Sequence, residues 1–507
     1  MVEKYMPSKF LNFFKPAVRI MPEVKQPDRE VSFKEKMIWT LVALIIYLIM
    51  SNTPLYGVNL AGQEDYFYWL RVILASSRGT LTELGISPIV TAGLIMQLLV
   101  GSKIINVNMS DPVDRGLFTG AQKVMALLLT IFQGVAYLLG GAFGEPGTGE
   151  GQLAVGDMIL IFMQLLAATV IIMLLDEMLQ KGWGVGSGVS LFIAAGVAGQ
   201  ILWNSFSFVP TSTDNDGDGL YRGAIVAFFQ SIFDPSQGVS VGETFIRANG
   251  APGIFGVFTT IIIFVIVVYF EAMRIEIPLS YAGYSGFKGK YPMKLMYVSN
   301  IPVILAQALY ANVLFFAQLL AGPNASFRLN HPNWAPFLDL IAQFPEEAGA
   351  QGQMRPVGGF AYLLTPPNGL SSLISGDAGN WPVLHAVLYL LIFILLCIGL
   401  GKIWVEVSGL APRDIAGQII DSKMQIDGFR RSDKVIEKIL KRYIPTLTIL
   451  NGIIVGVLSF GADFLGALGS GTGLLLMVGI MQNYAESISK EAAAEQYPAL
   501  RGFLGLT

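Results

Sequence analysis

The sequence predicts an all-α polytopic membrane protein whose ten transmembrane helices form two inverted, pseudo-symmetric halves around a central pore. Of its 507 residues, 53% are apolar and only 14% are Asp, Glu, Lys or Arg, whereas a soluble domain carries roughly 25% charged residues. Ten apolar stretches are long enough to cross a bilayer, and two short motifs recur five spans apart. These observations exclude a water-soluble globule.

The few polar groups also limit the chemistry that this chain can perform. The formal net charge is only −3, so no overall basic field points to nucleic acid. One cysteine, Cys397, and two histidines, His331 and His385, are too few for a disulfide framework or a Cys/His zinc site. No nucleophile with a nearby base stands out. We therefore expect no enzymatic activity, no cofactor and no metal.

The order of the spans defines the domain organisation. A spanning helix needs about 20 mostly apolar residues, because hydrocarbon offers no other partner for backbone N–H and C=O groups. The second span is interrupted by Ser76–Gly79 and by Gly85–Pro88. The ten predicted spans are 36–52, 66–101, 121–144, 154–175, 186–204, 252–273, 295–321, 382–405, 443–464 and 471–488. The resulting segments are an N-terminal segment, 1–35, a first half, 36–204, an outer loop, 205–251, a second half, 252–488, with cytoplasmic loops 274–294 and 402–442, and a C-terminal tail, 489–507.

The distribution of basic residues predicts the orientation in the membrane. If the N-terminus is cytoplasmic, 27 of the 33 Lys and Arg residues lie inside and six lie outside. This bias follows the positive-inside rule and places both termini in the cytoplasm, in what we expect to be the cell (plasma) membrane. The first 36 residues are too polar for a signal peptide, so the first span should direct insertion. The long outer loops, 205–251 and 323–380, should lie on the extracytoplasmic surface, with a short helix at 221–233.

Two motif pairs suggest that the halves are internal repeats. Gly186–Ile193 opens the fifth span and Gly469–Leu476 opens the tenth, while Ile86–Val90 in the second span matches Asn300–Ile304 in the seventh. Short Gly-rich matches arise by chance, but both pairs share a separation of five spans. Since five is odd, the second copy would be inverted, as in transporters and channels built from repeats. Spans two, five, seven and ten would then line a central pathway.

The proposed lining is apolar, which bears on what could pass. Ile86 and Val90, and likewise Val189 and Ile193, are spaced i and i+4 and share one helix face. Apolar residues that face lipid or a neighbouring helix would show the same spacing. An ion-coupled secondary transporter of a small solute is the alternative function, but it would place charged residues near the bilayer midplane. The span interiors contain almost none.

Several long motifs resemble the SecY family, the channel-forming alpha subunit of the protein translocon, and its archaeal and eukaryotic branch is the closer match. They lie between about residues 20 and 490 and comprise Phe33–Lys36, Glu83–Leu99, Arg115–Lys123, Tyr297–Leu305, Thr365–Ser372 and Lys441–Pro445. The resemblance implies a channel that passes unfolded secretory polypeptides and releases transmembrane segments sideways into lipid. It also implies gamma (SecE-like) and beta subunits, a ribosome with its nascent polypeptide, and signal sequences as partners.

The resemblance further implies a pore ring and a plug. Spacing had indicated four of the ring positions, whereas Ile304 and Leu476 rest on the family alone. The implied ring is Ile86, Val90, Val189, Ile193, Ile304 and Leu476. Residues 65–76, with the cluster Tyr66, Phe67, Tyr68 and Trp69, resemble the family's plug, although an interfacial aromatic anchor has the same composition.

Two further sets of polar residues follow from the same resemblance. The lateral gate would carry Thr91, Gln97, Gln133, Asn300, Gln307 and Asn312, which ordinary helix packing explains nearly as well. Ribosome contact would involve Arg430, Arg431, Lys434, Lys438, Lys441 and Arg442, with Lys288 and Lys290 on the second loop. A basic inner loop that only sets topology is the alternative. The loop tip, 280–286, lacks the basic residues often found there.

Two other motifs match known ligand-binding loops only in part. Asp214–Gly219 matches the first half of a calcium loop, but position twelve is Ile225, where a bidentate Glu is needed. A solvated acidic turn is therefore favoured. Gly286–Lys290 departs from a phosphate-binding loop, because position 284 is Tyr and Tyr291 follows the Lys.

Overall fold

Nine of the ten predicted spans match helices of the computed structural model over most of their length, whereas in the second, 66–101, a helix forms only at 87–101 and residues 66–76 lie outside the described part. The structure describes residues 9–58, 77–102, 104–105, 107, 112–139, 143, 154–210, 219–233, 240–247, 251–281, 288–322, 327–328, 331–345, 356–367, 369, 382–421, 424–426 and 432–496. The ten helices are α2 (Phe33–Asn52), α4 (Ser87–Gly101), α5 (Pro112–Leu139), α6 (Val155–Met178), α7 (Gly188–Phe206), α9 (Ile254–Ala272), α10 (Ile301–Ala321), α15 (Pro382–Val407), α17 (Asp433–Phe464) and α18 (Gly471–Gln496). Among the described residues, seven helical segments are long and apolar enough to cross a membrane, and α4 is a shorter apolar helix.

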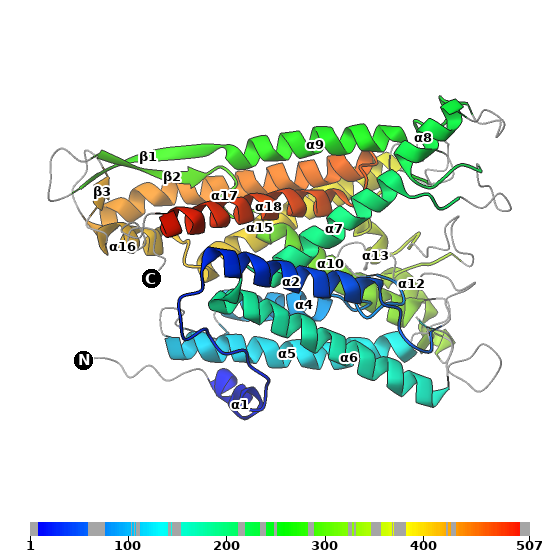
Figure 1. The fold of residues 1–507 in the computed structure, drawn as a ribbon, viewed down its shortest axis with the longest axis horizontal. Helices are drawn as coiled ribbons and strands as arrows, with labels where there is room; N and C mark the ends of the chain where they lie inside the picture. The colour runs from blue at the N-terminus through cyan, green and yellow to red at the C-terminus, as the bar shows by residue number, and fades with distance from the viewer. Residues whose placement is uncertain are drawn as a thin grey trace.

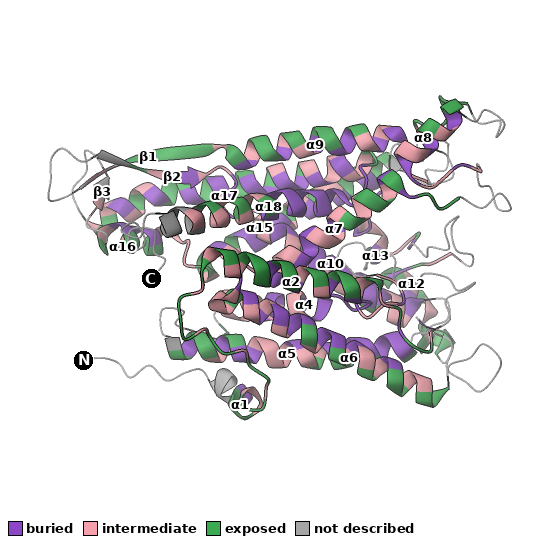
Figure 2. Cartoon of the chain, in the orientation of Figure 1, coloured by how far each residue is buried: buried purple, intermediate pink, exposed green. Residues whose placement is uncertain are grey.

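The long helices run side by side along the longest axis of the molecule (Figure 1). In that view α2, α4, α5 and α6 lie on one side and α9, α15, α17 and α18 on the other, with α7 and α10 between them. Buried residues are concentrated on the inward surfaces of these helices, and exposed residues on the outward surfaces (Figure 2). This is the burial pattern of a bundle whose outer surface faces lipid.

The two motif pairs have matching backbone geometry. Gly186 and Gly469, each two residues before its helix, have φ of 72° and 96°. Only glycine adopts this left-handed conformation without strain. Asp176 accepts a backbone hydrogen bond from Val189 at 3.0 Å near the start of α7, and Asp463 accepts one from Gly471 at 2.5 Å at the start of α18. A glycine turn followed by a helix start that donates to an aspartate carboxylate thus occurs in both halves.

The second motif pair repeats in the same way. Gly85 and Ser299 both have φ of 53°. Each is followed by a residue that caps a helix with nearly identical dihedrals, −93° and 1° at Ile86 and −90° and −1° at Asn300. A proline is the second residue of both helices, where its missing N–H costs nothing. In Figure 1, α7 and α18 run in opposite directions, as expected for an inverted repeat.

A small antiparallel sheet joins the two loops that were predicted to be cytoplasmic. Its strands are β1 (Arg274–Tyr281), β2 (Lys288–Lys294) and β3 (Met424–Ile426), in the order β2-β1-β3. Ile277 of β1 pairs with Tyr291 of β2, while Leu279 pairs with Ile426 of β3. The sheet and α16 (Pro412–Asp421) cover a second apolar cluster that includes Ile415 and the first turns of α17. Sequence reasoning did not predict this sheet.

Shorter helices lie at the two ends of the bundle. The surface helix predicted at 221–233 is confirmed as α8 (Ala224–Phe233). Other short elements are α1 (Lys9–Val18), η1 (Leu179–Trp183), η3 (Pro332–Trp334), α12 (Ala335–Ile341) and α13 (Phe360–Leu363). Helix α1 was not predicted, and it packs on α5 through Phe14, beside Phe118 and Ala121.

Ion pairs and a hydrogen bond connect the segment after α1 to helices α5 and α6. Lys181 donates to the backbone carbonyl of Val24 at 2.6 Å and forms an ion pair with Glu23 at 2.5 Å. The ammonium of Lys181 therefore holds the pKa of the Glu23 carboxyl below its usual value. Lys181 also pairs with Glu177, which in turn pairs with Lys123 of α5. The first half thus has a continuous polar connection from its N-terminal segment to α5.

Candidate functional site

All six predicted ring residues lie in one continuous apolar cluster at the centre of the bundle. Ile86, Ile193 and Leu476 are 0%, 3% and 3% exposed, respectively. The other three, Val90, Val189 and Ile304, are partly buried and pack against the same cluster. The chain thus brings aliphatic side chains from α4, α7, α10 and α18 into one apolar interior.

These side chains come from equivalent places on their helices. Ile86 immediately precedes α4, and the remaining five lie within the first two turns of α4, α7, α10 or α18. Helix starts are positioned here by the repeated Gly and Pro turns. The broken second span therefore serves to bring a helix start into the interior, where non-helical backbone is tolerated because protein surrounds it.

Charged groups lie beside this cluster, and the carboxylate of Asp176 accepts a hydrogen bond from the backbone N–H of the ring residue Val189. The carboxylate of Glu83 is buried and accepts a hydrogen bond from the backbone N–H of Gly79, so it stabilises the turn that precedes α4. Glu271, at the end of α9, is 1% exposed. Among the described residues, the six positions belong to one apolar cluster, whereas a solute transporter would require a charged pocket at this crossing.

One pair of predicted gate residues connects the two helices expected to part. The side-chain amide of Asn312 on α10 donates to the hydroxyl of Thr91 on α4 at 3.0 Å. The same amide also donates to the carbonyl of Ala308 at 2.6 Å, one turn earlier on its own helix. Thr91 is buried and Asn312 partly buried, so water competes little for this bond.

The remaining gate residues are distributed over several interfaces. Asn300 donates to the carbonyl of Leu475 at 3.0 Å, which ties the start of α10 to α18 and not to α4. Gln133 on α5 and Gln307 on α10 are buried, and Gln97 on α4 is partly buried. The sequence therefore grouped together residues that the structure places at different contacts.

The surroundings of Asn300 include residues that sequence reasoning missed. A Cβ at Gly479 of α18 would lie 1.7 Å from the amide nitrogen of Asn300 and 3.0 Å from a carboxylate oxygen of Glu271. Only glycine leaves room for both side chains. Asn451 of α17 donates to the carbonyl of Ser299 at 3.2 Å. Three helices thus hold the strained turn that starts α10, and no local motif signals this, because the contributing residues are far apart in the chain.

The predicted basic contact surface is in part described. Four of its residues are exposed on the first turns of α17, with Ile436, Leu440 and Ile444 buried on the opposite face. These four are Lys434, Lys438, Lys441 and Arg442. Lys441 pairs with Glu437 at 2.8 Å, and Lys290 on β2 forms an ion pair with Glu276 on β1.

Several predicted residues lie outside the part of the chain that the structure describes. They are the plug segment 65–76 with Tyr66, Phe67, Tyr68 and Trp69, the basic residues Arg430 and Arg431, the side chain of Lys288, and the acidic turn at 214–218.

Comparisons with known proteins show the family and support the fold. Residues 80–485 match the SecY family model. The chain belongs to the SecY family. Residues 45–79 match the plug domain of Sec61p, and this range includes the segment predicted as the plug.

Relatives extend over nearly the whole chain. The Sec61 subunit alpha of Dictyostelium discoideum, a protein transport protein, is 42% identical over 484 residues, which are 95% of this chain and 97% of the relative. A solved structure described as a protein conducting channel has a TM-score of 0.74 at 38% identity and covers 96% of this chain and 99% of its own. Sec61 in the canine ribosome-channel complex from the endoplasmic reticulum has a TM-score of 0.72 at 37% identity, with the same coverage.

Replacing Thr91 by Val or Asn312 by Leu should loosen the contact between α4 and α10. An interhelical hydrogen bond in a membrane protein contributes about 0.6–2 kcal/mol, so channel opening in planar bilayers should rise about 3-fold to 30-fold. The double variant should open no more than the single ones, because both remove the same bond. Thr446→Val is the matched control, since among the described residues the hydroxyl of Thr446 donates within its own helix, to the carbonyl of Arg442. Fully additive effects of the two substitutions would contradict the assignment.

Proposed function

We propose that this SecY-family protein is a channel that conducts unfolded secretory polypeptides across the membrane and releases transmembrane segments laterally into lipid. The observation that carries the proposal is that six aliphatic side chains at four helix starts all belong to one central apolar cluster. Relatives described as a protein transport protein and a protein conducting channel support it. The six ring positions are all aliphatic, whereas a solute transporter would place charged residues at this crossing.

The six ring side chains suit such a channel for a physical reason. Branched aliphatic groups present no hydrogen-bond donors or acceptors, so they close around a peptide of any sequence without binding it. When the channel is idle, the same groups resist wetting and keep ions out. A polar or charged lining would bind some peptide segments tightly and would admit water and ions.

We propose that α4 and α10 form the lateral gate and that segment 65–76 acts as the plug on the outer side of the ring. The Thr91–Asn312 bond supports the first assignment, because it is weak enough to be broken by a passing hydrophobic segment. The match of residues 45–79 to the plug domain of Sec61p supports the second.

The channel as proposed is passive and works with partners. We infer that a ribosome supplies the nascent polypeptide and the driving force, that signal sequences open the gate, and that gamma (SecE-like) and beta subunits complete the complex. The canine relative in a ribosome-channel complex supports the ribosome as a partner. The excess of Lys and Arg on one side supports cytoplasmic termini. Location in the plasma membrane stays a prediction, and fractionation against endoplasmic reticulum markers tests it.

Polar substitution within the ring should open an ion leak in the idle channel. The triple variant Ile86→Asn, Val90→Asn and Ile304→Asn places amides where only aliphatic groups meet, so water should enter and conduct. The measurement is the conductance of the reconstituted complex without a translocating chain. The matched control replaces Ile86 and Ile304 by Leu and Val90 by Ile, which keeps the constriction apolar and should keep it tight. Equal conductance of the two triple variants would remove these residues from the ring.

Reversal of charge on the exposed face of α17 should weaken ribosome binding. Lys434→Glu and Lys438→Glu remove cations that would contact RNA phosphates, so the affinity should fall and the salt dependence of binding should decrease by about one per lost contact. Lys402→Glu carries the same charge change on exposed α15 and is the matched control. An equal loss of affinity in all three variants would mean that Lys434 and Lys438 act only through the general positive charge of this side and do not contact the ribosome.

A further inference from the structure

Helix α8, in the loop that connects the two halves, has an unusual distribution of polar and apolar residues. Its sequence, AIVAFFQSIF, contains only two polar residues. Phe229, Ile232 and Phe233 are exposed by 52%, 45% and 80%, while Ala224, Ala227 and Ser231 form the buried face. A helix in water buries its apolar face and exposes its polar one. Here the largest apolar side chains are on the outside.

Both polar residues of α8 are engaged within the protein. The side-chain oxygen of Gln230 accepts a hydrogen bond from the backbone N–H of Tyr221 at 2.8 Å. The hydroxyl of Ser231 donates to the carbonyl of Phe228 at 2.8 Å. Both side chains thus bond within the protein, and the exposed residues of α8 are Phe229, Ile232 and Phe233.

This exposed face is held in a fixed position. Arg247 is 4% exposed, and its guanidinium donates to the carbonyl of Tyr221 at 3.0 Å and to that of Pro252 at 3.5 Å. These bonds connect the residues just before α8 to those just before α9. Gly223 and Gly253 allow the segments to approach closely, since a Cβ would lie 2.6 Å from the backbone nitrogen of Ser207 and 2.4 Å from the carbonyl oxygen of Phe245, respectively. These hydrogen bonds and close backbone contacts attach α8 firmly to the rest of the protein.

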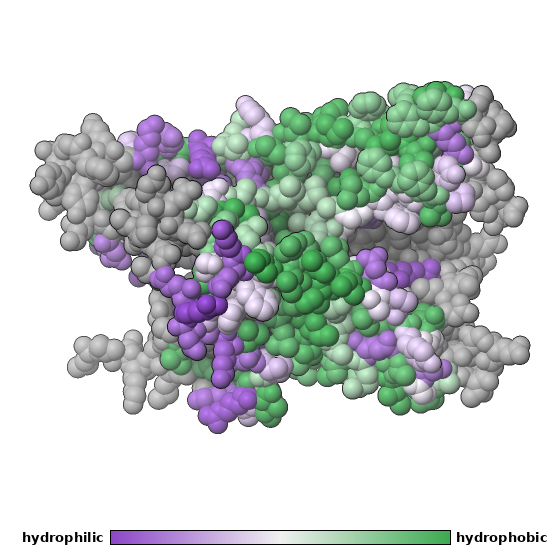
Figure 3. All heavy atoms as spheres, in the orientation of Figure 1, coloured by the Kyte–Doolittle hydropathy of each residue, from purple (hydrophilic) through white to green (hydrophobic). Residues whose placement is uncertain are grey.

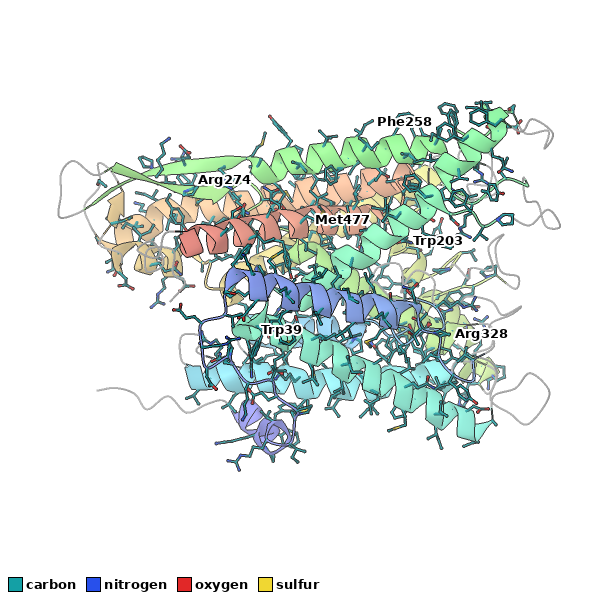
Figure 4. All side chains as sticks on the ribbon, in the orientation of Figure 1. Trp39, Trp203, Phe258, Arg274, Arg328 and Met477 are labelled. Carbon is teal, nitrogen blue, oxygen red and sulfur yellow. The ribbon has the colours of Figure 1, made fainter. Side chains whose placement is uncertain are left out.

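The apolar face of α8 continues into surfaces that face lipid. Helix α9 is a candidate membrane span, and its outer face exposes Phe258, Ile262 and Val265. Figure 1 shows α8 at the end of α9 that is opposite the sheet, and in Figure 3 hydrophobic atoms extend along the upper edge without interruption to that end. Trp203, 55% exposed near the end of α7, and Phe258 near the start of α9 project from neighbouring elements (Figure 4).

We propose that α8 is an interfacial anchor whose Phe229, Ile232 and Phe233 insert into the outer leaflet at the boundary between headgroups and acyl chains. Lipid is the occupant that fits, because the face is continuous with the lipid-facing surface of α9 and carries no group for specific recognition. Aromatic side chains concentrate at this depth of a bilayer, and interfacial helices bury one apolar face there. The anchor would fix the depth of the outer ends of α7 and α9, which belong to different halves.

Spin-label accessibility in the reconstituted complex tests the proposal. Cys397 is the chain's one cysteine and is buried, so Cys397→Ala gives a background for single labels at Phe229→Cys and Phe233→Cys. Val265→Cys, in the lipid-facing middle of α9, and Glu243→Cys, on an exposed turn nearby, are the matched controls. Collision with oxygen reports lipid, and collision with a water-soluble nickel chelate reports water.

The proposal predicts that oxygen collisions exceed nickel collisions severalfold at 229 and 233, as at 265, with the reverse at 243. Headgroup labels in the vesicles should also broaden the signals at 229 and 233 more than that at 265, because the anchor lies shallower. Dominant nickel collisions at both positions would place α8 in water and overturn the proposal. Low collision rates with both reagents would mean that a protein surface covers the face, and would overturn it equally.

Discussion

Contact among aliphatic side chains at the centre of the bundle is the interaction on which the rest of the structure depends. Hydrocarbon forces the backbone into continuous helices, yet a central constriction requires several helices to begin inside the protein. Turns at Gly85, Gly186, Ser299 and Gly469 precede α4, α7, α10 and α18 and satisfy both demands, because protein surrounds them. At α7 and α18 an aspartate carboxylate also accepts a backbone hydrogen bond.

Around this apolar centre, some helices are connected by several polar contacts and others by few. Ion pairs and backbone bonds connect the N-terminal segment, α5 and α6, and the strained turn before α10 is held by α9, α17 and α18. Between α4 and α10, the contact includes one side-chain hydrogen bond. A contact of that strength is compatible with reversible parting, whereas the flanking contacts favour movement of each part as a unit.

Much of this architecture could be predicted from sequence, and the misses have physical causes. Apolar length predicts the spans, and Gly and Pro predict the turns, because both signals are local. Strands β1 and β2 were missed because each contains a proline, Pro278 or Pro292, which argues against a strand. Strand β3 was missed because it has only three residues and pairs with a strand far away in the chain. Gly479 and Glu271 beside Asn300 carry no local signal, and Asn300 was grouped with the α4–α10 contact although its bond goes to α18. Helix α1 was missed because basic residues and Pro16 make its segment look irregular.

Disulfide crosslinking to an arrested secretory chain tests the central claim most directly. A nascent chain that carries one cysteine, stalled with that cysteine at mid-membrane, should crosslink to Val90→Cys and Ile193→Cys, whose side chains belong to the central cluster. Val457→Cys, exposed on the outer surface of α17, should stay unlinked. Silence at 90 and 193, or equal crosslinking at 457, would mean that the polypeptide does not pass through the aliphatic constriction.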